Sequence, residues 1–202
     1  MHDIDSGLQD IAHIRAMMQR ATKFLSLSGL SGIGAGVVAL AGVWFAAPII
    51  ERGGDGVVGS VAGIAAATLA GAVVCALLFS YRMARARKLS FWNAASRNLL
   101  LALAAPLAGG GVLSISLAAI GTYGLIPAAM LLFYGVALLH AADYTLGEVR
   151  YLGLGEMGLG ALAAAWPGSG LLFWALGFGA LHVVYGVIMW IRYERKDVPR
   201  PA

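Results

Sequence analysis

Six long apolar blocks follow one another along this chain, and they restrict its possible folds more than any other feature. They occupy residues 24–50, 57–81, 99–120, 125–142, 149–166 and 171–191. A helix needs roughly 20 residues to cross the hydrocarbon core of a bilayer, which is about 30 Å thick. Each block meets or approaches that length. We therefore expect an all-α fold, namely a polytopic membrane protein with six transmembrane helices.

The overall composition agrees with a membrane location. Of the 202 residues, 60% are hydrophobic and only 12% are charged, and the mean hydropathy is +0.81. A soluble domain of this length could not bury so much apolar surface in one core. The lipid bilayer is therefore the expected surrounding of most of the chain.

The basic residues predict how the helices are oriented. Of the 14 lysines and arginines, all but Arg52 lie near the chain ends or at every second boundary between blocks. Short basic loops stay in the cytoplasm during insertion. Both termini and the segments 82–88 and 192–196 are therefore expected in the cytoplasm. The segments 51–56, 121–124 and 167–170 are expected on the other side.

The regions outside the apolar blocks are short. Residues 1–23 do not have the pattern of a secretory signal peptide. They contain apolar residues at helical spacing, which predicts a short amphipathic helix on the cytoplasmic surface; these are Leu8, Ile11, Ile14 and Met18. We expect this cytoplasmic segment at 1–23, a six-helix transmembrane domain at 24–191, and a basic cytoplasmic tail at 192–202.

The net charge of +4 and the isoelectric point near 9.5 could point to nucleic acid. The basic residues flank apolar blocks, however, where they set topology and attract anionic head groups, so no nucleic-acid partner is expected. The single cysteine, Cys75, lies inside an apolar block, which leaves no disulfide framework and no cysteine-based metal site. No phosphate-binding glycine loop, catalytic triad or intramembrane lysine is recognisable. We therefore assign no catalytic residue, no metal and no cofactor.

Small residues recur at every fourth position in the first two blocks. They are Ser28, Gly32 and Gly36 in the first block and Gly59, Gly63, Ala67, Gly71 and Cys75 in the second. Small residues at this spacing let two helix backbones approach closely and gain dispersion contacts. We expect the first two helices to pack through these residues, either on each other or across a dimer interface. A homo-oligomer or a membrane-protein partner is compatible with this pattern.

Glu156 and His182 are an acidic and a basic residue that lie well inside the apolar blocks. The fifth and sixth blocks form a hairpin that turns at 167–170, so Glu156 is expected opposite position 181. A charged group at this depth costs a few kcal/mol, and pairing or protonation lowers that cost. Two interpretations remain open. The pair either ties two helices together or handles a proton or cation.

A second polar cluster lies near the expected cytoplasmic ends of blocks three, four and five. Its candidate site residues are Arg97, His140, Asp143, Tyr144, Glu148 and Arg150. We expect Arg97 to lie level with Glu148 and within reach of Asp143. The cluster is either a network of interfacial salt bridges or the rim of a binding pocket. His140 and Asp143 have a spacing compatible with two metal ligands, but no second ligand pair accompanies them. His140 and His182 differ too much in depth to be axial ligands of one haem.

Three segments resemble known proteins. The sequence LLFWALGFGALHVVYGVIMWIRYER at 171–195, together with FLSLSGLSG at 24–32 and RYLG at 150–153, is similar to a family of uncharacterised bacterial six-span inner-membrane proteins. The resemblance implies a location in the bacterial inner membrane. It implies no activity, ligand or catalytic residue.

These observations leave three hypotheses about function. The first is a non-enzymatic membrane protein that acts through helix–helix association. The second is a small transporter or channel for protons, cations or a small solute, which would use Glu156 and His182. The third is an enzyme acting on a lipid or lipid-linked substrate through His140, Asp143 and Arg97, although no recognised catalytic constellation supports it.

Overall fold

The computed structural model describes residues 28–195, and these residues are helical without any strand. The first five long helices are α2 (Gly29–Arg52), α3 (Val57–Ala86), α4 (Ala94–Ala119), α5 (Ile126–Ala141) and α6 (Val149–Ala165), and the short helix η1 (Tyr123–Leu125) precedes α5. The last long segment runs through η2 (Pro167–Ser169), α7 (Gly170–Trp174), η3 (Ala175–Leu181), α8 (His182–Met189) and η4 (Trp190–Glu194). Of these, η3 and η4 are π-helical. The expected amphipathic helix at 1–23 and residues 196–202 of the basic tail lie outside the described residues.

Five of the described helices are long and apolar enough to cross a membrane. They span Gly29–Arg52, Val57–Ala86, Ala94–Ala119, Tyr123–Ala141 and Pro167–Glu194. The remaining helix, α6, has 17 residues and is shorter than each of these. The fold is therefore that of a helical membrane protein, with five helices that meet the requirements of a span by length and composition.

The turn between α3 and α4 differs from the one expected at 82–88. Helix α3 continues to Ala86, because the alanines, arginines and methionine after Tyr81 are good helix formers. Helix α4 begins at Ala94, earlier than the expected residue 99, because Asn93 caps it. The Asn93 side chain accepts a hydrogen bond from the N–H of Ser96, and the Ser96 hydroxyl accepts one from the N–H of Asn93. This reciprocal arrangement satisfies two backbone donors at the start of the helix.

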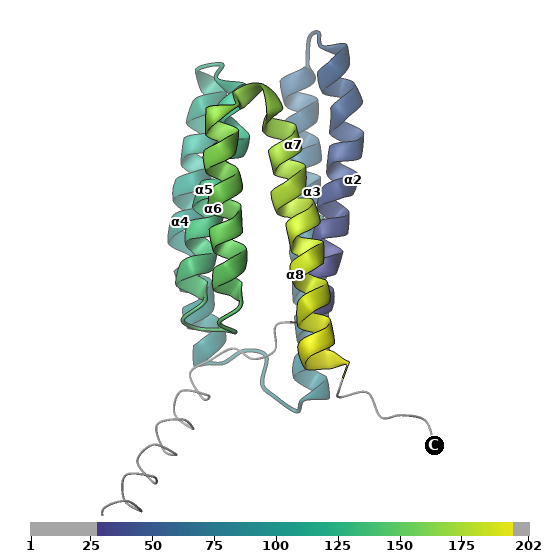
Figure 1. Ribbon diagram of the computed structural model, residues 1–202, viewed down its shortest axis with the longest axis vertical. Helices are drawn as coiled ribbons and strands as arrows, with labels where there is room; N and C mark the ends of the chain where they lie inside the picture. Colours follow the sequence, from purple (N-terminus) through teal and green to yellow (C-terminus); the bar gives the residue numbers. More distant parts are fainter. Residues whose placement is uncertain (1–27, 196–202) are drawn as a thin grey trace, which may run out of the picture.

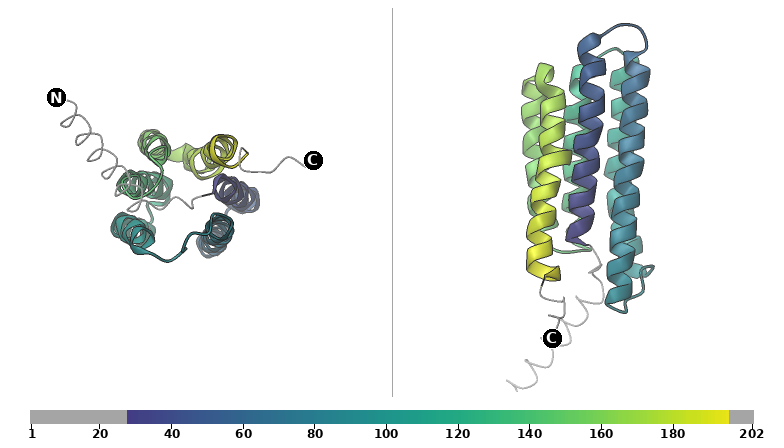
Figure 2. Two further views of the ribbon diagram at one scale, coloured as in Figure 1. Left: turned by 90° about the horizontal axis from the view of Figure 1, so that it is seen from below. Right: turned by 90° about the vertical axis from the view of Figure 1, so that its right-hand side faces the viewer.

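The long helices form two groups that lie side by side (Figure 1). In one group α5 packs between α4 and α6, and in the other α2 packs between α3 and the last segment. Figure 2 shows the same arrangement along the helix axes, with the α3–α4 connection crossing between the groups. The groups contact each other where α5 and α6 meet α7 and η3. We call the end of the bundle where α3 ends and α4 begins the basic end, since Arg82, Arg85, Arg192 and Arg195 lie there.

Glycines bring α2 into close contact with the last segment. A Cβ atom built on Gly186 would lie 2.5 Å from the backbone nitrogen of Ile33 and 2.6 Å from the carbonyl oxygen of Gly29. A Cβ atom on Gly36 would lie 2.7 Å from the carbonyl oxygen of Gly179, and one on Gly32 would lie 3.1 Å from the Cα of Gly186. Gly32 and Gly36 therefore face the last segment. The sequence pattern instead predicts that they contact α3 or a dimer partner. They face the last segment because it carries its own small residues at matching spacing.

Helix α3 contacts a different face of α2, and only through part of its length. Cys75 lies opposite Gly34, Gly71 opposite Val38, and Thr68 opposite Gly42. A Cβ atom on Gly59 or Gly63 would meet nothing within 4 Å, so these two glycines do not pack against α2. Successive residues of an α-helix are rotated by about 100°. A stripe at every fourth position therefore drifts around the helix, and residues 59 and 75 point about 160° apart.

Candidate functional site

Glu156 lies near the middle of α6, and its side chain is fully buried, with 0% exposure. The carboxylate packs against Gly177 of η3 and Leu131 of α5. A Cβ atom built on Gly177 would lie 2.5 Å from Glu156 Oε2 and also 2.5 Å from Leu131 Cδ2. The absence of a side chain at position 177 is therefore what makes room for the carboxylate between α6 and the last segment.

His182 of α8 faces this carboxylate. Its Nδ1 atom lies 3.2 Å from Glu156 Oε1, and the two side chains are 8% and 0% exposed. The same Nδ1 atom lies 3.0 Å from the carbonyl oxygen of Gly177, which it contacts by a hydrogen bond. The position of the hairpin turn predicts that Glu156 lies opposite position 181. In the structure it lies opposite the next residue, His182. A titratable pair is thus enclosed between two helices of the bundle.

Tyr134 of α5 completes a row of three polar side chains. Its hydroxyl oxygen lies 2.9 Å from His182 Nε2, and the two rings are stacked with their centroids 5.4 Å apart. Sequence reasoning did not single out Tyr134, because a tyrosine in an apolar block is also a common packing residue. Only the position of α5 across from α8 identifies it as a member of the site.

The hydrogen bonds of His182 are compatible with two arrangements of protons. In a neutral imidazole with the proton on Nδ1, this nitrogen donates to the Gly177 carbonyl and Nε2 accepts from the Tyr134 hydroxyl. In a protonated imidazole, Nε2 donates to the Tyr134 oxygen and the positive charge lies beside Glu156. The contact with Glu156 has the distance of an ion pair, but neither carboxylate oxygen has a well-aligned hydrogen bond to residues 28–195. In the protonated arrangement, the carboxylate and the imidazole therefore interact mainly through charge.

The π-helical segment η3 shapes this site. It runs from Ala175 to Leu181, directly before His182, and contains Gly177 and Gly179. Segments of π-helix are rare and occur frequently at functional sites. Here the segment supplies both the carbonyl that binds His182 and the glycine that admits the carboxylate. Gly179, on the same segment, packs against the side chain of Leu40 in α2.

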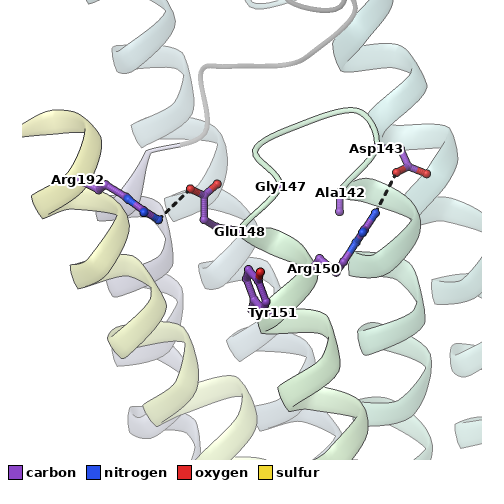
Figure 3. A pocket seen from close by; sticks show the side chains of 7 residues that line it. All are labelled: Ala142, Asp143, Gly147, Glu148, Arg150, Tyr151 and Arg192. Carbon is purple, nitrogen blue, oxygen red and sulfur yellow. Dashed lines mark hydrogen bonds and ion pairs between the residues drawn. The ribbon is translucent and has the colours of Figure 1, made fainter.

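A second group of polar residues surrounds an open pocket of about 440 Å³ at the basic end (Figure 3). It is lined by Ala142, Asp143, Gly147, Glu148, Arg150, Tyr151 and Arg192. Arg192 Nη1 lies 3.1 Å from Glu148 Oε1, and the Tyr193 hydroxyl donates to the same oxygen at 2.5 Å. The Arg150 guanidinium lies 3.6 Å from Asp143 on the other side of the pocket. Glu148 therefore joins the loop before α6 to the last segment.

Three of the expected cluster residues line this pocket, and three do not. Asp143, Glu148 and Arg150 line it, whereas Tyr144 packs against the apolar residues Ala95, Leu99 and Ala141. Arg97 and His140 are exposed, and within residues 28–195 neither forms an ion pair. Arg97 is expected at the same depth as Glu148, but the two residues do not form an ion pair. Glu148 pairs with Arg192 of the last segment and not with Arg97 of α4.

Neither polar group has the composition of a metal centre. Within the described part of the chain, no three His, Cys, Asp or Glu side chains gather closely enough to hold a metal ion together. The side chains of Glu156, His182 and Tyr134 are themselves proton donors and acceptors.

Comparisons with known proteins do not add an activity to this geometry. No protein-family model matches the chain, and neither a curated protein nor a solved structure matches it. The site's own residues therefore carry the functional argument.

Proposed function

We propose that this protein is a six-span protein of the bacterial inner membrane that takes up and releases a proton at Glu156 and His182. In this proposal it works as a small transporter or channel, in which proton binding at the pair accompanies the passage of protons, cations or a small solute. The observation that carries the proposal is the complete burial of Glu156 beside a histidine in the middle of the helical bundle.

The course of the chain supports six spans. Helix α5 ends at the basic end, and the last segment begins at the opposite end, so α6 has to connect the two ends (Figure 1). Its 17 residues extend about 26 Å at 1.5 Å per residue, slightly less than the hydrocarbon thickness of about 30 Å. The arginines of the basic end favour its assignment to the cytoplasm, which supports a cytoplasmic location of both chain termini.

A charge on the buried Glu156 side chain is energetically costly, and a proton bound at the pair lowers this cost. A single charged carboxylate in the centre of a membrane helix costs roughly 3 kcal/mol on insertion scales. A protonated His182 would offset this charge, and protonation of Glu156 itself would remove it. In both cases one proton is bound at the pair. When that proton is lost, the buried Glu156 carboxylate keeps a negative charge that no neighbouring positive charge offsets. Proton binding is thus coupled to the energy of the helix arrangement around the pair.

A pair that only ties two helices together would not need to be ionisable. Two hydroxyl or amide side chains could form hydrogen bonds across α6 and the last segment without a charge. Ionisable side chains inside a membrane are rare, and they occur mostly in proton relays and along ion pathways. Neither carboxylate oxygen of Glu156 has a hydrogen-bond partner among the described residues. A contact that only joins two helices would be expected to contain such hydrogen bonds. These features favour the transport hypothesis over the association hypothesis.

Proton flux through reconstituted vesicles tests this proposal. The protein is placed in liposomes that contain a pH-sensitive dye, and a pH gradient is applied with and without a potassium-driven membrane potential. We expect flux from the unaltered protein and its loss in Glu156→Gln, which keeps the shape of the side chain but cannot ionise. Glu51→Gln, at an exposed position of α2, serves as the control. Equal flux in Glu156→Gln and the unaltered protein would remove the proposed role of the pair.

A second function, association with another copy or with another membrane protein, is favoured by α3. A Cβ atom built on its glycines Gly59 and Gly63 would meet nothing within 4 Å, although small residues at this spacing commonly serve as helix contacts. If α3 is an interface, Gly63→Leu disrupts it by adding a bulky side chain. Native mass spectrometry in a mild detergent then detects fewer oligomers for this variant. A monomer for the unaltered protein would contradict association with another copy.

A further inference from the structure

We infer that the Glu156–His182 pair exchanges its proton with the basic end of the bundle, through Tyr134 and Tyr185. This inference deepens the proposed function and rests on it, because it names the route by which the proton reaches the pair. The route follows from the different chemistry of the side chains on the two sides of the site.

The side that faces away from the basic end is filled with apolar groups. A cluster around Ala128, Leu131 and Ala163 lies there, and Leu159, Phe173 and Phe178 pack against it. None of these six side chains has a hydrogen-bonding group. Phe178 also packs against Tyr134 and Trp174, with ring centroids 5.1 and 5.0 Å apart. Among the described residues, the six side chains of this cluster offer a proton no donor or acceptor to follow, so the cluster works as a seal.

The side toward the basic end contains two phenol groups. The buried residues Leu138, Ala142, Val149 and Leu152 form the cluster on this side, and Tyr134, Leu181 and Tyr185 pack against it. Tyr134 is hydrogen-bonded to His182. The hydroxyl oxygen of Tyr185 is buried and has no hydrogen-bond partner in residues 28–195. A buried polar group without a partner is costly, and native structures satisfy most of them, so this hydroxyl points to an exchange position.

Tyr185 lies between the buried site and the polar groups of the basic end. It is within electrostatic range of Tyr134 on one side and of Glu148 and Tyr193 on the other. Glu148 lines the open pocket at the basic end and accepts the hydrogen bond from the Tyr193 hydroxyl. Tyr134 and Tyr185 also pack against the same buried cluster, which includes Ala142 and Val149 beside the pocket. The inferred route runs from the pocket through Tyr185 to the Tyr134–His182 hydrogen bond.

The transfer can proceed without a charged tyrosine, because a hydroxyl both donates and accepts hydrogen bonds. A proton from the pocket binds the Tyr185 oxygen while the original Tyr185 proton moves to the Tyr134 oxygen, and the original Tyr134 proton moves to His182 Nε2. The imidazolium then passes its Nδ1 proton to Glu156 Oε1. One proton enters and one proton ends on the carboxylate, and His182 is neutral again with its proton on Nε2. The reverse sequence releases the proton.

Within residues 28–195, the titratable groups seen to face Glu156 belong to this route. From the last segment His182 faces the carboxylate, and from α5 Tyr134 is within electrostatic range of it. The neighbouring positions Leu131 and Gly177 contribute no titratable side chain. Exchange at Glu156 therefore depends on the imidazole and, through it, on the two phenols.

The test measures the rate and the extent of Glu156 protonation separately. Purified full-length protein in oriented proteoliposomes is exposed to a rapid pH change on the basic side, and infrared spectroscopy follows the carboxylic acid band that is absent in Glu156→Gln. We expect Tyr185→Phe to slow proton uptake about tenfold or more and to leave the final amplitude of the band unchanged. Tyr123→Phe, at an exposed position near the opposite end, should behave like the unaltered protein.

The unchanged amplitude distinguishes a proton route from a packing role, since a disturbed fold would alter the final protonation as well. Uptake from the basic side at an equal rate in Tyr185→Phe and the unaltered protein would overturn the route, while the proposed function would stand. Faster uptake after a pH change on the opposite side would overturn it too. If no band depends on Glu156 in the unaltered protein, the transfer to the carboxylate is overturned. If no imidazole band of His182 responds to the pH change either, the proposed function itself fails.

Discussion

The hydroxyl of Ser28 donates a hydrogen bond to the carboxylate of Glu194, with 3.1 Å between Oγ and Oε2. Ser28 is the N-cap of α2, and Glu194 is the last residue of η4. The backbone N–H of Gly29 donates to the other carboxylate oxygen. The end of the last segment thus caps the start of α2, where unpaired N–H groups and the helix dipole favour a negative charge. This buried contact joins segments that are far apart in the sequence.

Glu194→Ala is expected to destabilise the protein. The substitution removes the acceptor from two donors and the negative charge from the start of α2, which together should cost about 1–2 kcal/mol of the free energy of unfolding. The melting temperature in detergent should fall accordingly. The neighbouring substitution Arg195→Ala, at an exposed position, is the matched control and should change this free energy by less than about 0.5 kcal/mol. Equal melting temperatures for both variants would contradict the capping role.

Tyr134→Phe is expected to lower the stability of the protein without creating a cavity in the core. The phenylalanine ring keeps the stacking with His182 and the tilted contact with Phe178, but the hydrogen bond to His182 Nε2 is lost. A hydrogen bond of this kind contributes about 1 kcal/mol to stability, and thermal or denaturant unfolding in detergent measures the loss. Tyr123→Phe removes an exposed hydroxyl and should have no such effect. A Tyr134→Phe protein as stable as the unaltered one would indicate that this hydroxyl is paired equally well in the unfolded state.

Gly186→Ala is expected to force α2 and the last segment apart. The added Cβ atom would lie within 2.6 Å of backbone atoms of Gly29 and Ile33, and backbone atoms cannot rotate away as a side chain can. Overpacking of this kind costs about 1–3 kcal/mol, which should lower the melting temperature. Gly59→Ala provides the comparison at a position where the Cβ atom meets nothing within 4 Å. There the better helix propensity of alanine should leave stability equal or slightly higher.

The orientation in the membrane can be measured with reporter fusions. A fusion after Gly54 joins the reporter to the turn between α2 and α3, and a fusion after Lys88 joins it to the turn at the basic end. Because α3 lies between these two positions, we expect the reporters on opposite sides, with the one after Lys88 in the cytoplasm. Both reporters on one side would show that α3 does not cross the membrane.

The sequence determined the helical class and the approximate position of each long helix. Apolar blocks of about 20 residues leave few alternatives, because a backbone in hydrocarbon has to satisfy its own hydrogen bonds. The sequence also predicted that Glu156 and His182 lie at the same depth, because the short turn between α6 and the last segment sets the register of these two helices. These predictions depend on local chain properties: hydropathy, turn position and the rise of a helix.

Only the tertiary structure decided which faces of the helices meet. Gly32 and Gly36 fit either of two neighbouring helices, and the choice of the last segment over α3 depends on how small residues match on both partners. Glu148 pairs with Arg192 and not with Arg97 for the same kind of reason, since charge does not specify the partner helix. Tyr134 and Glu194 acquire their roles through contacts across 48 and 166 positions in the sequence. Hydropathy and spacing are averaged along one helix, whereas such contacts depend on the rotation of each helix about its axis, which only the packing of all helices together determines.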